Sequence, residues 1–232
     1  MHRPDPNDFH AAPLNPLPWV VWLLALPLIA IEAAIALGQS GLAGGAGAIG
    51  WRQMAYQRFA FVPDYLRAMW DSGIYPPELL ARFVTYPFIH GSFTHALMVL
   101  VFVLALGKMV GELFRAPAVL AVFFGSGIAG ALAYAALPVA VPPLYGGYPA
   151  VFGLVGAFTY VLWARLGVLN ANRARAFTLI GLLMGIRLLF GVLFGGNWDW
   201  VAELVGFAAG FGLSALVAPG GVARLMLLMR RR

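Results

Sequence analysis

The stretch APAVLAVFFGSGIAGALAYAAL, residues 116–137, carries no charged side chain over 22 residues. At 1.5 Å per residue, a helix of that length is about 33 Å long, enough to cross the hydrocarbon layer of a bilayer. Five further runs of 17 or more mainly apolar residues lie at 17–37, 94–110, 150–169, 176–194 and 200–218. The sequence therefore predicts an all-α, polytopic membrane protein with six transmembrane helices.

The composition of the whole chain supports the same class. Hydrophobic residues make up 62% of the chain and charged residues 10%, and the mean hydropathy is +0.84, whereas a soluble domain carries about 25% charged residues. The net charge of +6 does not indicate a nucleic-acid partner, because the arginines lie at the ends of apolar runs and form no contiguous basic patch. The absence of cysteine excludes disulfides, thiolate metal sites and a cysteine nucleophile.

A long first loop, residues 38–93, separates the first two apolar runs. Its beginning, GLAGGAGAIG at residues 41–50, is typical of a flexible loop. Residues 51–83 mix Trp, Tyr, Phe and Arg at helical spacing, a pattern typical of helices that lie in the membrane interface. We therefore expect an interfacial first loop.

The Lys and Arg distribution predicts the orientation. Residues 1–16 lack a basic segment with a cleavage site, so we expect a short cytoplasmic tail before a retained first helix. Residues 17–219 would form the membrane domain, and residues 220–232 a basic cytoplasmic tail against anionic lipids. With the N-terminus inside, ten Lys and Arg are cytoplasmic and four lie in the first loop. We expect a bacterial-type inner-membrane protein with both termini cytoplasmic.

Four features in chain order form a recognisable pattern. Arg82 in the first loop is followed by HGSFTH, residues 90–95, with two histidines separated by four residues. Residues 146–158, GGYPAVFGLVGAF, and residues 202–210, AELVGFAAG, are glycine-containing segments of the fourth and sixth runs. The fourth feature is the six-helix plan with its long first loop. Together, over residues from about 17 to 218, they resemble the rhomboid family of intramembrane serine proteases.

The resemblance also shows where this chain departs from the family. Aligning FGLVG, residues 152–156, puts other residue types at the positions of the family's catalytic groups. These are Tyr148 for the nucleophilic serine, Pro149 for the following glycine, Glu203 for the catalytic histidine and Val99 for the asparagine that helps bind the oxyanion. The resemblance implies a former active-site cavity that includes His90, His95, Val99, Gly146, Pro149 and Phe152, the last matching an aromatic that the family stacks beneath its histidine.

The loss of the dyad does not depend on one alignment. No serine occurs between Ser126 and Ser214, and no histidine occurs after His95. In a Ser–His dyad the imidazole accepts the serine proton and returns it to the leaving amine. A tyrosine hydroxyl, as at Tyr148, ordinarily titrates near pH ~10, and Pro149 removes a backbone N–H donor. We therefore assign no catalytic residue.

Besides Lys108 and Arg165 near the cytoplasmic ends, the apolar runs contain three charged residues: Glu32, Arg187 and Glu203. Ionisable groups at such positions are costly and usually pair or face water. We expect Glu203 to accept a hydrogen bond from Tyr148 or His95, with client or proton chemistry as the alternative. Arg187 could pair with Glu203, although their depths differ by about 9 Å along the helix axes. Glu32 and Arg187 could instead pair with a transmembrane helix of another protein.

The remaining candidates have structural interpretations. His90, His95 and Glu203 could form a two-histidine, one-carboxylate metal site. However, residues five apart on one helix point about 140° apart, so we expect neither a metal nor another cofactor. The glycines of the fourth and sixth runs indicate close helix–helix packing. These are Gly153, Gly156, Gly206, Gly210 and Gly212.

The resemblance leads to three hypotheses of function. The first is a pseudoprotease that binds transmembrane segments of client or partner proteins without cleaving them, using a lateral gate beside the fifth helix and the first loop. The second is an active but divergent intramembrane serine protease. The third is an accessory structural subunit of a larger membrane complex, which unpaired charges at Glu32 and Arg187 would favour.

Overall fold

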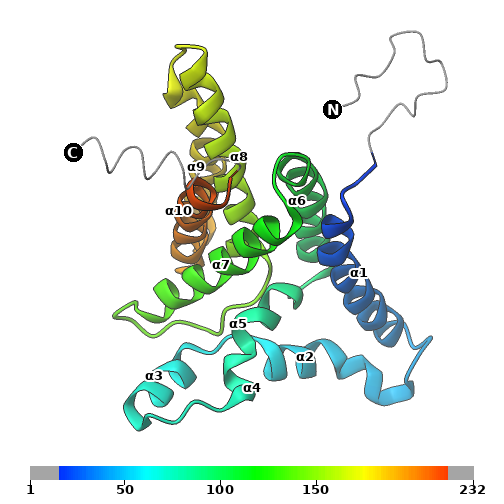
Figure 1. Cartoon of the computed structure of the whole chain (residues 1–232). Helices are drawn as coiled ribbons and strands as arrows, with labels where there is room; N and C mark the ends of the chain where they lie inside the picture. Colours follow the sequence, from blue (N-terminus) through cyan, green and yellow to red (C-terminus); the bar gives the residue numbers. More distant parts are fainter. Residues whose placement is uncertain (1–15, 219–232) are drawn as a thin grey trace, which may run out of the picture.

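The computed structural model describes residues 16–218, so the predicted tails lie, apart from Pro16, outside the described residues. Six helices are long and apolar enough to cross a membrane, which confirms the all-α, six-helix prediction (Figure 1). They are α1 (Trp19–Gln39), α6 (Phe93–Gly111), α7 (Ala116–Ala135), α8 (Tyr148–Val168), α9 (Thr178–Phe194), which a short 3-10 helix η3 (Arg173–Phe177) precedes, and α10 (Asp199–Val217).

Local sequence explains where several of these helices begin and end. The Ser92 hydroxyl accepts a hydrogen bond from the His95 backbone N–H at 3.2 Å and so caps the start of α6. Pro117 occupies the first turn of α7, where its missing N–H leaves no helical bond unmade. Gly195, with φ of +76°, ends α9. Each predicted run is therefore recovered with small shifts at its ends.

Helices α7, α8 and α10 pack against one another, and α8 approaches the other two closely through glycine. A side chain on Gly153 would overlap Ser126 of α7, and one on Gly210 would meet the Gly153 backbone. Likewise, a side chain on Gly156 would lie against backbone atoms of α10, and one on Gly206 against the Pro149 backbone. The predicted packing role fits these four glycines. It is wrong for Gly212, where a methyl group would have no neighbouring atom within 4 Å.

The first loop crosses the end of the bundle opposite to the end where α1 begins and α10 ends (Figure 1). It contains η1 (Gly45–Gly50), α2 (Trp51–Phe59), α3 (Pro63–Ser72), α4 (Pro77–Leu80), α5 (Arg82–Thr85) and η2 (Tyr86–Phe88). The prediction of a flexible loop at residues 41–50 was wrong in part. Ala48 is fully buried, so residues 45–50 pack as a 3-10 helix at the end of α1.

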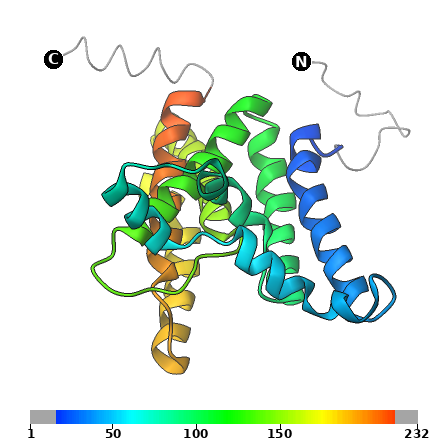
Figure 2. The ribbon, with the colours of Figure 1, turned by 90° about the horizontal axis from the view of Figure 1, so that it is seen from below.

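Helix α9 stands at the edge of the bundle (Figure 2). Of its residues only Ile180 and Met184 are buried, and most of its large apolar side chains face outward. The helix is therefore held by few apolar contacts. The Gly195–Trp198 connection and the polar contacts of Arg187 with α10 contribute correspondingly more to its position.

Candidate functional site

The segment before α8 places the family's nucleophile position next to the histidines. Gly146 has φ of +94°, and a side chain there would overlap the His95 imidazole. Its N–H donates to the Tyr86 carbonyl at 3.0 Å. A two-way bridge between Phe61 and Leu144, with N···O distances of 2.9 and 2.8 Å, ties the same segment to the first loop. Only glycine fits at 146, and it brings the start of α8 against α6.

Tyr148, which the alignment assigns to the nucleophile position, stacks on His95. The two ring centroids are 4.9 Å apart with an interplanar angle of 16°. No hydrogen bond joins their polar atoms in the described part of the chain, where His95 Nε2 is buried without a partner. Tyr148 is thus held by ring stacking, and no base is in place to take its proton.

His90 lies outside α6, because the Ser92 cap starts that helix at Phe93. The imidazoles of His90 and His95 meet edge to face at 4.9 Å, so the prediction that they point about 140° apart was wrong. His90 Nε2 accepts a weak hydrogen bond of 3.4 Å from the Gly147 N–H. His90 therefore supports the turn into α8 from behind His95.

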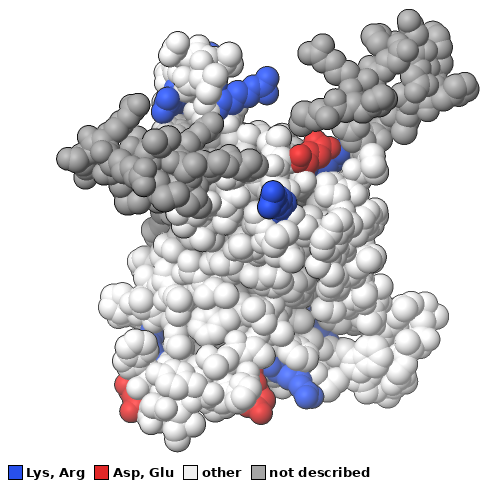
Figure 3. Space-filling model, in the orientation of Figure 1, with Lys and Arg blue, Asp and Glu red and all other residues white. Residues whose placement is uncertain are grey.

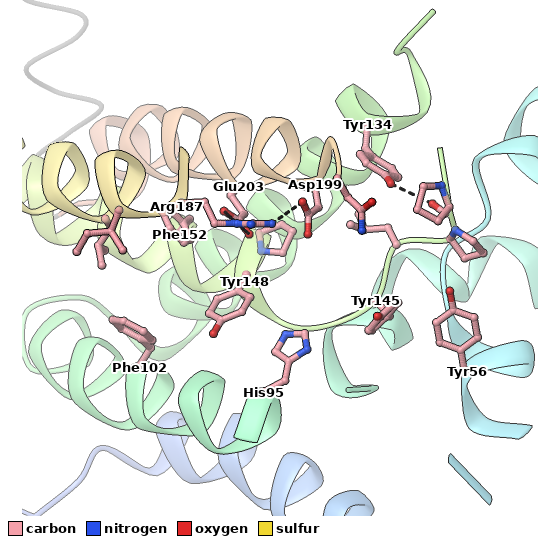
Figure 4. Close-up of a pocket in the computed structure, with 17 residues that line it drawn as sticks. Tyr56, His95, Phe102, Tyr134, Tyr145, Tyr148, Phe152, Arg187, Asp199 and Glu203 are labelled. Atoms are coloured by element: carbon pink, nitrogen blue, oxygen red, sulfur yellow. Dashed lines mark hydrogen bonds and ion pairs between the residues drawn. The ribbon is translucent and has the colours of Figure 1, made fainter. Parts of the chain in front are cut away.

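We expected Glu203, which the alignment assigns to the histidine position, to accept a hydrogen bond from Tyr148 or His95. In the structure Glu203 contacts Arg187 instead. Arg187 Nε lies 3.4 Å from both carboxylate oxygens and donates to Oε1. Arg187 Nη2 also pairs with Asp199 Oδ1 at 2.5 Å. Figure 4 shows the guanidinium lying between the two carboxylates. The dyad position is thus part of an ionic cluster that joins α9 to α10.

Glu32 also has a partner within the chain. Arg52 of α2 binds its two carboxylate oxygens at 2.6 and 3.1 Å and donates to the His90 carbonyl at 2.8 Å. Both side chains are largely buried. Glu32 and Arg187 are therefore paired internally, and the suggestion that they need a partner protein's helix loses its basis.

A cavity of about 560 Å³ lies near the first-loop end of the bundle, between the stacked rings of Tyr148 and His95 and the ionic cluster (Figure 4). Of the predicted cavity residues, His95, Pro149 and Phe152 line it together with Tyr148 and Glu203. The other three lie one layer behind: His90 against His95, Gly146 against His95, and Val99 against Gly147. Its remaining lining residues are Tyr56, Phe102, Tyr134, Pro142, Pro143, Leu144, Tyr145, Leu183, Ile186, Arg187, Asn197 and Asp199.

Asp199 and three tyrosines of this cavity were not predicted from the sequence. Asp199 precedes Glu203 by four residues, which puts both on one helix face. This spacing could have predicted that Asp199 lies beside Glu203. Tyr56 and Tyr145, whose rings meet at 4.8 Å, and Tyr134 come from three separate segments. No sequence pattern links those segments before the first loop is folded.

Arg82, the arginine of the resemblance's first motif, acts within the first loop. It donates to the Ala60 carbonyl at 2.9 Å, and its guanidinium lies 5.1 Å from the centre of the Tyr65 ring. Arg82 thus joins α5 to the turn between α2 and α3, without reaching the cavity.

His90 predicts a pH dependence of stability. Burial, followed by the neighbouring His95 and, more weakly, Arg52, lowers the pKa of His90 to about 3, against a smaller opposing effect of the Phe88 backbone. An exposed histidine has a pKa of about 6.5. Below that pH, residue 90 is therefore protonated in the unfolded chain but still neutral in the folded chain. Stability should therefore fall as the pH drops from about 6.5 toward 3, by at most about 1.4 kcal/mol per pH unit.

This expectation is checked by melting the purified protein in mild detergent between pH 7 and pH 5. His90→Asn keeps an acceptor for the Gly147 N–H but does not titrate, so its melting temperature should depend less on pH. Equal slopes for the wild type and His90→Asn would show that His90 does not govern the effect.

Comparison with known proteins places this geometry in a family. A family model described as the Rhomboid domain matches residues 77–220, which is more than half of the chain and runs from α4 past the end of α10. A comparison with curated proteins finds no match. The matched region holds the two-histidine segment, the glycine-rich start of α8 and the α10 motif, all of which meet at the cavity. The chain belongs to the rhomboid family.

Proposed function

We propose that this rhomboid-family chain is a pseudoprotease, which binds transmembrane segments of client or partner membrane proteins without cleaving them. The observation that carries the proposal is the ionic cluster at the dyad position. Glu203 stands where the family has its catalytic histidine, and it is engaged by Arg187 at 3.4 Å. The Glu203 carboxylate is engaged by the Arg187 guanidinium, and in the described structure it contacts no hydroxyl nucleophile.

The buried serines of α7 and α10 offer no replacement for the missing serine. Ser126 and Ser214 are fully buried and neither lines the cavity. Ser126 packs against Gly153, and the Ser214 hydroxyl donates to the Gly210 carbonyl at 2.7 Å. Nucleophilic catalysis needs a hydroxyl within hydrogen-bond reach of a base, so these side chains argue against the divergent-protease alternative.

The outward face of α9 is the proposed docking surface for clients. Leu182 and Leu189 are 59% and 55% exposed, and Ile186 both lines the cavity and is 47% exposed. A transmembrane segment packed on this face would lie beside the cavity mouth. The accessory-subunit alternative lacks support of its own, because Glu32 and Arg187 have partners within the chain.

We further propose an inner-membrane location with both termini cytoplasmic. On the described chain, the end near the termini carries Lys108, Arg115, Arg165, Arg173 and Arg175 against Glu112. At the first-loop end, acidic and basic side chains are both present (Figure 3). This asymmetry supports the proposed orientation through the positive-inside rule. In that orientation the cavity lies at the outer side of the membrane.

The proposal is tested in proteoliposomes that contain the purified protein and a single-span model segment. We expect no cleavage product and no labelling by a fluorophosphonate probe, with an active rhomboid protease as the positive control. A photo-crosslinking amino acid at Leu189 of α9 should capture the segment. The same amino acid at Leu26 of α1, which is equally exposed at 55%, is the matched control and should capture much less.

Specific cleavage that Tyr148→Phe or Glu203→Gln abolishes would refute the pseudoprotease proposal. Equal capture from Leu189 and Leu26 would refute α9 as the docking surface.

A further inference from the structure

The charges that line the cavity do not balance. The wall carries one guanidinium, that of Arg187, against two carboxyl groups, those of Asp199 and Glu203. The Glu203 side chain is only 4% exposed, and within residues 16–218 its Oε2 has no hydrogen-bond partner. Arg187 Nε lies 3.4 Å from this oxygen but donates its hydrogen bond to Oε1. One carboxylate oxygen is therefore buried at the cavity wall without a hydrogen bond, and such a group is costly unless a ligand or a proton satisfies it.

Aromatic rings form the wall that includes the start of α8. Tyr145 meets Tyr56 at 4.8 Å on one side and His95 at 6.1 Å on the other, and His95 stacks on Tyr148 at 4.9 Å. The close-up shows this row on the opposite side of the cavity from the ionic cluster (Figure 4). The faces of aromatic rings attract cations, so the rings and the excess carboxylate favour the same class of ligand.

The cavity suits an organic cation better than a metal ion. Its volume of about 560 Å³ is in the range of pockets that hold small organic groups. In the described part of the chain no three His, Cys, Asp or Glu side chains are grouped as metal ligands. A lysine or arginine side chain would bring one positive charge, donors for Glu203 Oε2 and an apolar stem for contact with Ile186 and Leu183.

We infer that the cavity recognises one basic side chain, a lysine or arginine, at the outer end of the client's transmembrane segment. This inference rests on the proposed function and on the proposed orientation. Because α9 supplies Leu183, Ile186 and Arg187 to the cavity wall, a segment docked on α9 can place such a side chain in the cavity. Basic residues are concentrated at the cytoplasmic ends of transmembrane segments. Few segments therefore carry a basic residue at the outer end, and a site that requires one selects those segments from the rest.

The test compares model segments that differ at one position, captured by the crosslinker at Leu189. Lysine in the outermost turn is expected to raise capture about tenfold over glutamine at the same position, since charge pairing and cation–π contact in a desolvated site are worth about one decade in affinity. Lysine in the innermost turn should give no gain. Glu203→Gln should reduce the lysine-to-glutamine ratio to about one, whereas Glu112→Gln, a carboxylate near the termini and away from the cavity, should leave that ratio unchanged.

Two further arms make the result decisive. Asp199→Asn removes another carboxylate from the cavity wall. If Glu203→Gln does not fold, Asp199→Asn takes its place, and it should likewise reduce the lysine-to-glutamine capture ratio. Added butylammonium should lower capture of the lysine segment and leave capture of the glutamine segment unchanged. If butylammonium lowers capture of both segments equally, the inference is overturned in favour of a free amine as the ligand. Equal capture of lysine and glutamine segments overturns this inference and leaves the proposed function standing. Capture of neither segment overturns both.

Discussion

Replacing Gly210 by alanine is expected to lower the free energy of unfolding by about 3 kcal/mol, the upper end of the usual cost of overpacking a core. A methyl group on Gly210 would overlap the carbonyl oxygen of Gly153 and lie 2.5 Å from its Cα. Both are backbone atoms, so no side-chain rotation relieves the overlap and α8 must move away from α10. Unfolding of the purified protein by heat or by SDS measures the loss.

Gly212→Ala is the matched control in the same helix. Gly212 is exposed, with open space around it. Its replacement by alanine should leave the free energy of unfolding unchanged or raise it by ~0.5–1 kcal/mol, the amount by which alanine stabilises a helix relative to glycine. The contrast follows from helix geometry, since two residues correspond to about 200° of rotation. If Gly210→Ala and Gly212→Ala were equally mild, the packing of α8 on α10 would have to be looser than described.

The fold could be predicted from the sequence because hydropathy and length are local properties. An apolar run of about 20 residues must form a helix in hydrocarbon, where every backbone polar group needs an internal partner. The ends of the runs were less certain. The segment from His90 to His95 was assigned to a helix, and its first residues lie outside it, because a single capping hydroxyl at Ser92 decides where α6 begins.

The site could be predicted only in part. Alignment assigned Tyr148 and Glu203 to the dyad positions, but it could not say what they contact. Counting depth along helix axes made an Arg187–Glu203 contact look distant, whereas a long arginine side chain can reach several ångströms toward the membrane surface. The Arg187–Asp199 and Arg52–Glu32 pairs depend on how connecting segments fold back on the helices, and that information is not local in the sequence.

The internal pairing of Glu32 leads to the second large effect. Arg52→Met is expected to destabilise the protein by about 3–5 kcal/mol, because it leaves a buried carboxylate without its counter-charge. The side chains of Arg52 and Glu32 are 17% and 10% exposed, and Arg52 also serves the His90 carbonyl. Losing that second contact should loosen the turn into α8 that His90 supports.

Combining Arg52→Met with Glu32→Leu should recover much of this stability, since replacing both members of a buried ion pair by apolar groups is often close to neutral. Asp64→Asn is the control, because the Arg67–Asp64 pair is exposed and such pairs contribute at most about 1 kcal/mol. Unfolding measurements on the two single variants and the double variant give the coupling energy directly. An Arg52→Met variant no less stable than Asp64→Asn would mean that water or lipid headgroups, and not Arg52, satisfy Glu32. The first loop would then be held to the bundle mainly by Arg67, the Tyr86 hydroxyl and the bridge between Phe61 and Leu144.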